Sequence, residues 1–284
     1  MKVEILGSGG ALTTPRPGCD CKVCVEARAK GVPYSRAGPG YFLHGPDVLI
    51  DTSEDIVLQL NRAGIGEIAA AFYSHWHPDH TMGRRVWESR NSDLRGWPPE
   101  AKQIQTTPIY LPQQVAADLR TRLGGFEHLT FLAERRWVDL RELRDGESVP
   151  IAGWTFTPFR LAEDYVYAFL VEGTGKRVLV VPDETNGWEP GEDLRGIDLA
   201  IVPMGICEFQ PLTGERRLHE DHPLLRFEAT FEETLEIVAR LQARRTVLSH
   251  IEEMDGLSYD DLRQVERRLD GRVEFAFDGM LLDP

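Results

Sequence analysis

Short apolar runs alternate with amphipathic stretches along the whole chain, and this pattern predicts strands that alternate with helices. The first run, Lys2–Leu6, ends at the turn-forming residues Gly7-Ser8-Gly9-Gly10, so we expect an opening strand there. The run Ile68–Tyr73 also has the length of a strand, and it leads directly into a group of histidines. The other expected strands are Asp47–Asp51, Pro108–Leu111, Gly153–Phe159, Val166–Val171, Arg177–Val181, Asp198–Val202, Thr246–Leu248 and Val273–Phe277.

Helices are expected where apolar residues recur every three or four positions behind a residue that can cap a helix. Thr230-Phe231-Glu232-Glu233 has the spacing of a capping box, in which the first and fourth side chains each accept a backbone N–H from the other residue. Strands that alternate with helices are typical of layered α/β folds. The expected helices run from the cap Ser53 through Asn61, from Pro112 to about Leu123, from Thr230 to about Ala243, and onward from Ser258.

The composition is that of an ordinary globular protein, because 42% of the 284 residues are hydrophobic and 27% are charged. No linker rich in Pro, Ser or Gly divides the chain, so we expect a single domain over residues 1–284 whose two halves meet near residue 150. The net charge of −14 argues against long nucleic acid as a partner, because phosphate backbones attract surplus Lys and Arg. A local pocket for one small phosphate ester is still compatible with this charge.

No segment has the run of about 18 apolar residues that a membrane helix needs. Met1–Gly7 is too short for a secretion signal, so we expect a cytoplasmic protein without a membrane partner. Disulfides are rare in that compartment. Cys19, Cys21 and Cys24 lie within six residues and therefore favour metal ligation over cross-linking. Three thiolates can hold one tetrahedral zinc ion if a fourth ligand comes from elsewhere.

Four candidate metal ligands lie within the six residues His75-Trp76-His77-Pro78-Asp79-His80, at the expected end of a strand. In an extended backbone His75 and His77 point to the same side. Proline stops a strand and turns the chain, so Asp79 and His80 can face the same space. The segment can therefore serve two cations, one at each pair. Imidazole suits Zn, Fe, Ni and Cu, and a mixed set of carboxylate and imidazole also admits Mn and Fe.

This segment resembles the His-x-His-x-Asp-His signature of the metallo-β-lactamase superfamily. The resemblance implies a four-layer αβ/βα sandwich with a metal site at the edge of two facing sheets. It also implies that Asp183 bridges two metal ions and that His250 is the last histidine ligand; both follow apolar runs. Asp51 matches an aspartate of the family after an early strand, and we expect it to orient a ligand histidine. A carboxylate in a turn is the alternative for Asp51.

The sequence departs from this family at the third histidine. That residue normally follows a strand that corresponds to Gly153–Phe159, but Leu161-Ala162-Glu163-Asp164 stands there. We expect Glu163 to be the substitute ligand, and a carboxylate at this position would favour Mn or Fe over Zn. The alternative is that Glu163 is a solvated charge.

The Cys-x-Cys-x-x-Cys segment ahead of the histidines resembles one branch of the superfamily. That branch contains the phosphoribosyl cyclic phosphodiesterases and the B protein of pyrroloquinoline quinone biosynthesis, and the resemblance implies a structural zinc ion. In the phosphodiesterases a histidine three residues after the last active-site histidine completes this zinc site. Glu253 stands at that position here and is the first choice for the fourth ligand. The alternatives by chemistry are His219 and His222, followed by Cys207.

The resemblance and the ligand pattern together predict a binuclear metal-dependent hydrolase, and specifically a phosphodiesterase that acts on a small or cyclic ester. Two cations that share a water molecule lower its pKa and give hydroxide at neutral pH. Asp79 and His222 are the expected catalytic residues. The leaving group needs a proton, and the phosphodiesterases' histidine for this step is missing from Gly205-Ile206-Cys207-Glu208, so His222 or His219 is expected to supply it.

Other functions fit the same residues. A lactonase, a thioesterase or an iron-dependent biosynthetic enzyme would use the same fold with different chemistry. A metal-binding relative without activity is the alternative that the missing third histidine suggests.

The loops Arg84–Thr107 and Cys207–Phe227 are expected to flank the site and to select the substrate. Trp87 and Trp97, together with Arg84, Arg85 and Arg95, could contact a ring and a phosphate. A local apolar cluster or a homodimer contact is an equal alternative for the tryptophans.

Overall fold

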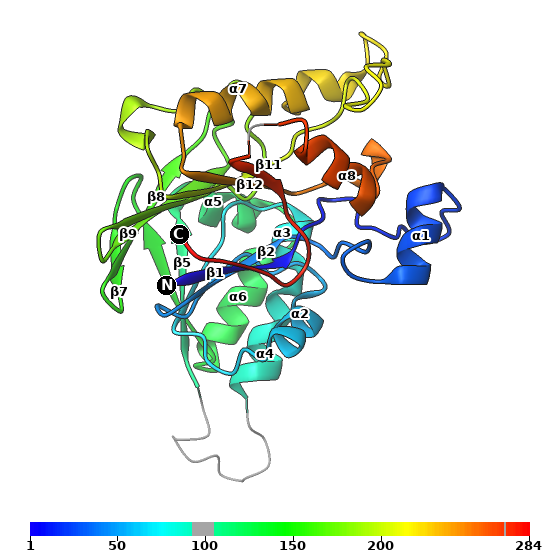
Figure 1. The fold of residues 1–284 in the computed structure, drawn as a ribbon. Coiled ribbons are helices and arrows are strands. Elements are labelled where there is room, and N and C mark those ends of the chain that lie inside the picture. The colour runs from blue at the N-terminus through cyan, green and yellow to red at the C-terminus, as the bar shows by residue number, and fades with distance from the viewer. Residues whose placement is uncertain (93–104, 270) are drawn as a thin grey trace.

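The computed structural model describes residues 1–92, 105–269 and 271–284, and Figure 1 shows their arrangement. These residues form two sheets of seven strands each. The first sheet has the order β14-β1-β2-β3-β4-β5-β6. Its strands are β1 (Lys2–Gly7), β2 (Gly40–His44), β3 (Val48–Ile50), β4 (Ala70–Phe72), β5 (Thr107–Pro112), β6 (Val138–Leu143) and β14 (Met280–Leu282).

The second sheet is built from the other half of the chain and has the order β13-β12-β11-β10-β9-β8-β7. The chain passes from one sheet to the other between β6 and β7, over residues 144–148. The strands of this sheet are β7 (Val149–Ile151), β8 (Trp154–Arg160), β9 (Tyr167–Gly173), β10 (Lys176–Val180), β11 (Leu199–Pro203), β12 (Arg245–Ser249) and β13 (Val273–Phe275).

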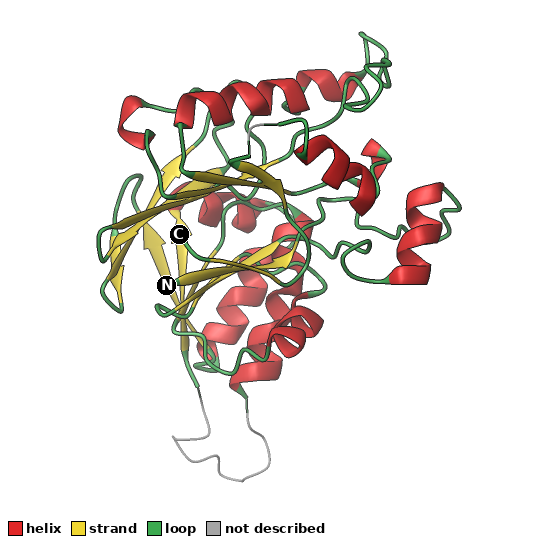
Figure 2. Ribbon diagram, in the orientation of Figure 1, coloured by secondary structure: helices red, strands yellow, loops and turns green. Residues whose placement is uncertain are grey.

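Helices cover the outer face of each sheet, and Figure 2 shows the two sheets between the two helical layers. The first sheet carries α2 (Ile56–Ala63), α4 (Val86–Asn91), α5 (Gln113–Thr121) and α6 (Gly125–Glu134). The second carries α7 (Phe231–Leu241) and α8 (Tyr259–Glu266). Shorter or separate elements are α1 (Lys22–Lys30), α3 (Pro78–Thr81), η1 (Met82–Arg85), η3 (Glu192–Leu194), η4 (Pro223–Arg226) and η5 (Glu253–Asp255).

Three apolar clusters fill the spaces between these layers. One lies between the sheets and contains Phe72 from the first sheet and Phe156 and Phe169 from the second. The other two lie under the helices on each side. Two sheets with apolar contents on both faces need helices outside them, because every face must be covered. The expected four-layer αβ/βα sandwich is therefore confirmed.

Several local expectations are confirmed and others are wrong. Thr230 and Ser258 both form complete capping boxes at the starts of α7 and α8. The predicted cap Ser53 does not cap α2, because its hydroxyl donates a hydrogen bond to the carbonyl of Gly38 and the helix begins after Asp55. None of the helices in the described ranges combines the length and the apolar character that crossing a bilayer requires.

The apolar pattern does not predict α1, α4, α6, β2, β6, β7 or β14. The strand β2 is buried on both faces, so it lacks the alternation of apolar and polar residues that marks a half-exposed strand. The helix α1 has no apolar stripe, and a cysteine, Cys21, caps it in place of the usual Ser, Thr, Asp or Asn.

Candidate metal centre

The candidate site lies where parallel strands of both sheets end. In the first sheet β3 and β4 run parallel; Asp51 follows β3, and Ser74 and His75 follow β4. In the second sheet β10, β11 and β12 run parallel, and Asp183 and His250 come after β10 and β12. Carboxyl ends of parallel strands meet at one edge of a sheet. This topology brings together side chains that are far apart in the sequence.

Pro78 turns the chain after the histidine pair. It stands at the first position of α3, where a residue without a backbone N–H does no harm, and His77 precedes it as the cap residue. The short helix folds back so that His80 is fully buried and stacks on His250, with 5.4 Å between ring centroids. The expected reversal of direction after His77 is therefore seen.

The first group of potential ligands consists of His75, His77 and Asp183. Their nearest ligand atoms all lie within 4.8 Å of one another. Nε2 of His75 is 3.2 Å from Oδ2 of Asp183, and Nδ1 of His77 is 3.8 Å from the same oxygen. Two imidazoles and a carboxylate in this arrangement are a donor set for a divalent cation.

The second group consists of Asp79, His80 and His250, whose ligand atoms also all lie within 4.8 Å of one another. Oδ2 of Asp79 is 3.3 Å from Nε2 of His80 and 3.5 Å from Nε2 of His250. Asp183 approaches this group with its other oxygen, because its Oδ1 is 3.3 Å from Nε2 of His250. One carboxylate therefore stands between two groups of three ligands.

Buried atoms without partners support this interpretation. Nε2 of His75 and Oδ2 of Asp79 are two of the eight buried side-chain atoms that have no hydrogen-bond partner within the described residues. A buried polar atom without a partner costs about 1–3 kcal/mol. Both atoms belong to the two groups, and a cation accepts lone pairs from both atom types. The residues of both groups therefore fit divalent cations.

The electrostatics of the protein without metal show that the site favours positive charge. Burial opposes the charged form of His250, but the carboxylates of Asp183 and Asp79 outweigh it and raise its pKa to about 9. The pKa of His80 is raised well above its ordinary value because Asp79 and Asp51 outweigh its burial in the same way. Burial and the positive charge of His80 lower the pKa of His75 to about 4. Protons on His80 and His250 thus balance the negative charge of the neighbouring carboxylates in the protein without metal.

Asp51 forms hydrogen bonds with two residues of the site, Ser74 and His80. It is fully buried, and its Oδ2 accepts hydrogen bonds from Nδ1 of His80 at 2.8 Å and from the hydroxyl of Ser74 at 2.6 Å. Its Oδ1 accepts the backbone N–H of Ser74 at 2.8 Å. The hydroxyl of Ser74 in turn lies 3.0 Å from Nδ1 of His75. Carboxylate bonds of this kind fix the tautomer and the direction of a metal-binding imidazole.

Glu163 joins neither group in the part of the chain that the structure describes, which corrects the expectation that it replaces the third histidine. Its backbone carbonyl accepts the N–H of Val166 at 3.2 Å and closes a tight turn. This turn brings the ring of Tyr165 beside the ligands instead, with its centroid 5.4 Å from that of His77 and 6.1 Å from that of His75. Burial and the surrounding carboxylates, Asp183 first among them, raise the pKa of the Tyr165 hydroxyl.

His222 also lies elsewhere than expected. It precedes η4, and its Nδ1 accepts the backbone N–H of Leu224 at 3.3 Å. No hydrogen bond or ion pair in the described ranges joins His222 to the two ligand groups. His219 pairs with Asp221 at 3.7 Å, and its side chain is 74% exposed. The expected role of either histidine as proton donor therefore finds no support in the structure.

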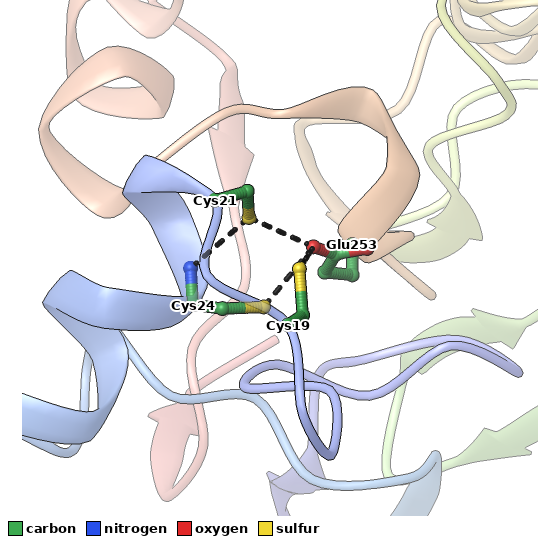
Figure 3. A group of neighbouring side chains, drawn as sticks. All are labelled: Cys19, Cys21, Cys24 and Glu253. Carbon is green, nitrogen blue, oxygen red and sulfur yellow. Dashed lines mark hydrogen bonds between the residues drawn. The ribbon is translucent and has the colours of Figure 1, made fainter.

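Cys19, Cys21 and Cys24 converge on one carboxylate oxygen of Glu253, as Figure 3 shows. The distances from their sulfurs to Oε1 of Glu253 are 3.4, 3.0 and 3.0 Å. Three thiols and a carboxylate form the four-member set that a tetrahedral zinc ion takes. Of the four candidates that the sequence offers for the fourth position, Glu253 is the one that the structure brings to the thiols. Cys207 is buried elsewhere, where its N–H donates to Asp255.

Two of the three thiols of this cluster resist ionisation in the protein without metal. Burial and the carboxylate of Glu253 raise the pKa of Cys24 to about 12 and also raise that of Cys21. The backbone N–H of Cys21 and the guanidinium of Arg16 lower the pKa of Cys19. Metal ligands of this type must lose their protons, so binding at this cluster releases protons.

Two acidic residues of the site were missed by sequence reasoning. Glu184 follows Asp183 and is 5% exposed, and its Oε1 accepts the backbone N–H of Ala229 at 3.2 Å. Burial and the neighbouring carboxylate of Glu228 raise the pKa of Glu184 to about 10. Glu252 follows His250 by two positions, and its Oε1 lies 3.7 Å from Nδ1 of His250. In both cases the signal was an acidic residue beside a predicted ligand, where the sequence alone does not distinguish a functional carboxylate from a solvated one.

Of the two tryptophans that were expected to contact a substrate, the described residues include Trp87. Trp87 is fully buried, and its Nε1 donates a hydrogen bond to the hydroxyl of Tyr73 at 3.0 Å. It therefore belongs to the apolar cluster under the first sheet, as the alternative explanation holds. Trp97 and Arg95 lie outside the described residues.

The fold resembles those of several solved structures. A structure described as a new diphosphatase from the PhnP family aligns with a TM-score of 0.73 at 23% identity, covering 100% of this chain and 97% of that one. Zn²⁺-bound PqqB from Methylobacterium extorquens aligns with a TM-score of 0.68 at 20% identity over 100% of both chains. YhfI from Bacillus subtilis, a metallo-β-lactamase fold protein, gives 0.68 at 18% identity over 99% of both chains. At these identities the likeness shows the fold.

A curated relative and a family model extend this comparison to the sequence. An octanoyltransferase from Porphyromonas gingivalis is 28% identical over 166 residues, which is 57% of this chain and 30% of that protein. The chain therefore spans less than a third of the length of this relative. The model of the beta-lactamase superfamily domain matches residues 47–251, which include both ligand groups. The chain belongs to the metallo-β-lactamase superfamily of hydrolases.

Proposed function

We propose that the protein is a binuclear metal-dependent phosphodiesterase that acts on a small or cyclic phosphate ester. The observation that carries this proposal is the position of Asp183 between two groups of ligands. One of its oxygens is 3.2 Å from His75 and the other is 3.3 Å from His250. A carboxylate in this position can hold two cations close together, which is the arrangement that phosphate ester hydrolysis uses.

The residues of the two groups have distinct tasks in this proposal. His75, His77 and Asp183 would hold one cation, and Asp79, His80 and His250 would hold the other. Bound divalent cations supply a Lewis acid, which lowers the pKa of a shared water molecule and stabilises negative charge on ester oxygens. Asp183 would hold the two groups at a fixed distance from each other, because each of its oxygens faces one group. Manganese, zinc and iron all suit this mixture of imidazole and carboxylate.

The surroundings of the site favour a substrate with little negative charge beyond its ester. The space beside Asp183 and His250 measures about 20 Å³ and is also lined by Glu184 and Glu228. The carboxylate of Glu228 adds negative charge beside the site, whereas the raised pKa of Glu184 keeps that side chain neutral at pH 7. The net charge of −14 repels a long polyanion. A diester with a single phosphate meets both conditions.

The same carboxylates favour a second candidate, the hydrolysis of a neutral ester such as a lactone or a thioester. Asp183, Glu163, Glu184 and Glu228 all surround Tyr165 closely enough to raise the pKa of its hydroxyl. A neutral ester would meet no charge repulsion there. Iron in the isolated protein, together with oxygen consumption, would instead support a biosynthetic oxidation.

The experiment compares these substrates on one protein. Protein loaded with Mn²⁺ or Zn²⁺ is assayed with bis-para-nitrophenyl phosphate, ribose cyclic phosphates, a lactone and a thioester. We expect phosphodiester hydrolysis that His77→Ala lowers at least 100-fold in kcat/KM. His44→Ala is the matched control, because His44 lies in β2 at the end opposite to the site and pairs with Glu4. Loaded protein that cleaves none of the phosphodiesters rules the proposal out.

A further inference from the structure

Two of the four ligand histidines, His75 and His80, share an arrangement that extends beyond the two ligand groups, whereas His77 turns its Nδ1 toward Asp183. Nε2 of His75 faces Asp183 in the first ligand group, and Nε2 of His80 faces Asp79 in the second. Nδ1 of each histidine faces a protein oxygen. The oxygen is the hydroxyl of Ser74 for His75, at 3.0 Å, and the carboxylate of Asp51 for His80, at 2.8 Å. Metal-binding histidines are generally held through their second nitrogen in this way, which fixes the tautomer.

The second ring nitrogen of His250 also faces a protein oxygen, at a distance longer than a hydrogen bond, and the sequence did not indicate this partner. Its Nε2 faces Asp183 and Asp79. Its Nδ1 is 3.7 Å from Oε1 of Glu252, a carboxylate whose side chain is 13% exposed. An anion at this distance favours a proton on Nδ1, which leaves the lone pair of Nε2 for a metal ion.

Glu252 is itself held in place by the N-terminal loop. Its Oε1 accepts the backbone N–H of Ala11 at 2.8 Å, and its Oε2 accepts that of Leu12 at 2.9 Å. Both oxygens are thus fixed by rigid donors. A carboxylate that is bound at both oxygens cannot rotate away from the imidazole without losing these bonds.

Gly10 allows this loop to approach so closely. A Cβ at position 10 would lie 2.0 Å from Oε1 of Glu252 and 2.8 Å from Cε1 of His250. Any side chain there would push the carboxylate and the imidazole apart. The glycine therefore fits a contact between the loop, Glu252 and His250 that tolerates no intervening atom.

Glu253, the residue after Glu252, belongs to the cysteine cluster. Glu253 contacts the three thiols, and its backbone N–H donates to the carbonyl of Leu12 at 3.1 Å. Neighbouring glutamates therefore serve different sites from one short segment. The cysteine cluster fixes the loop and the segment against each other, which keeps Glu252 in place.

We propose that Glu252 is a positioning residue that holds the imidazole of His250 in the orientation required by the second ligand group. This inference rests on the proposed two-metal site and adds to it a residue that lies outside both ligand groups and acts through the imidazole of His250. The loop residues Gly10, Ala11 and Leu12 keep its carboxylate in reach.

The test measures zinc affinity rather than activity alone. Protein stripped of metal is titrated with Zn²⁺ in competition with a chromophoric chelator, and His250→Ala identifies which binding step belongs to the second group. We expect Glu252→Gln to weaken that step 10- to 100-fold, the usual cost of losing such a partner, and to leave the step of the first group within threefold. Gly10→Ala retains the carboxylate but displaces it, so we expect the same selective loss.

Asp278→Asn is the matched control. Asp278 is buried and accepts the backbone N–H groups of Ser8 and Ala37, so it anchors the same N-terminal region without contacting His250. We expect this variant to lower the melting temperature and to keep both zinc affinities. If Glu252 only anchors the loop, Glu252→Gln will lower the melting temperature in the same manner without a selective loss of zinc affinity, and the inference is wrong. If the wild-type protein binds no zinc beyond the cysteine cluster, the proposed function fails instead.

Discussion

Replacing Asp51 by asparagine changes one atom and tests how the second ligand group is built. In the native protein the carboxylate accepts hydrogen bonds from Ser74 and from Nδ1 of His80. The amide of asparagine can still accept the backbone N–H of Ser74, but its NH₂ group then faces His80. To avoid two opposed donors, His80 must move its proton from Nδ1 to Nε2. The nitrogen that faces the cation then has no free lone pair.

The magnitude follows from this change of tautomer. Losing a carboxylate that holds a metal-binding histidine costs about 10- to 100-fold in affinity, and each factor of ten equals about 1.4 kcal/mol. Asp51 has a φ of 62°, a left-handed conformation that Asn tolerates better than most residues, so the backbone is not strained. Both hydrogen bonds to Oδ2, from His80 and from the Ser74 hydroxyl, are lost. Because the Ser74 hydroxyl can instead accept a bond from the new NH₂ group, the main cost to the stability of the metal-free protein is the charge-assisted bond from His80, about 1.5–3 kcal/mol. The variant therefore folds and binds its second cation weakly.

The assay combines urea unfolding in EDTA with zinc titration of the metal-free protein. Asp47→Asn is the matched control, because Asp47 also has a left-handed backbone, with φ of 53°, and lies at the other end of β3. Its carboxylate accepts only the exposed backbone N–H of Gly45 among the described contacts. If Asp51→Asn binds two cations beyond the cysteine cluster with wild-type affinity, the argument from tautomer control is refuted.

Three further outcomes are expected. Cys24→Ser should remove one zinc equivalent per chain and lower the melting temperature without loss of the two other equivalents at saturating zinc; a full metal content in atomic absorption would contradict this. The folded pKa of His250, about 9, exceeds the ordinary value of 6.5, so its imidazolium stabilises the metal-free fold below pH 6.5 and this stability is lost as the pH rises to about 9. The free energy of unfolding in EDTA should therefore fall over that range by up to ~1.4 kcal/mol per pH unit, and bound zinc should abolish the slope; a flat profile in EDTA speaks against it. His222→Ala should leave kcat for the best ester within threefold, and a 100-fold loss would restore the histidine as a proton donor.

Most residues of the two candidate ligand groups could be predicted because a pattern in the neighbouring sequence marks each of them. The histidine segment needs only a strand before it and a proline within it, and both Asp183 and His250 directly follow apolar runs. The ends of parallel strands then meet by topology, without any further information from the side chains. Glu253 was found by its offset from His250.

The remaining features depend on contacts that spacing does not encode. Whether Glu163 or Tyr165 turns toward the site is decided by the hydrogen bond from Val166 that closes their turn. Glu252 gains its place from the backbone of a loop more than 200 positions away in the sequence, and no local pattern indicates such a partner. Trp87 was ambiguous because a large ring suits a substrate pocket and a core equally well.

The central claim is that strand ends from both sheets enclose two cations around Asp183. The most direct measurement is an anomalous-scattering map of crystals of the protein as isolated, together with elemental analysis. The account predicts two peaks about 3.5–4 Å apart, one bounded by His75, His77 and Asp183 and the other by Asp79, His80 and His250, plus a third peak at the cysteine cluster. Fully loaded crystals that show no peak beside Asp183, or that show the ions held by other side chains, would contradict it.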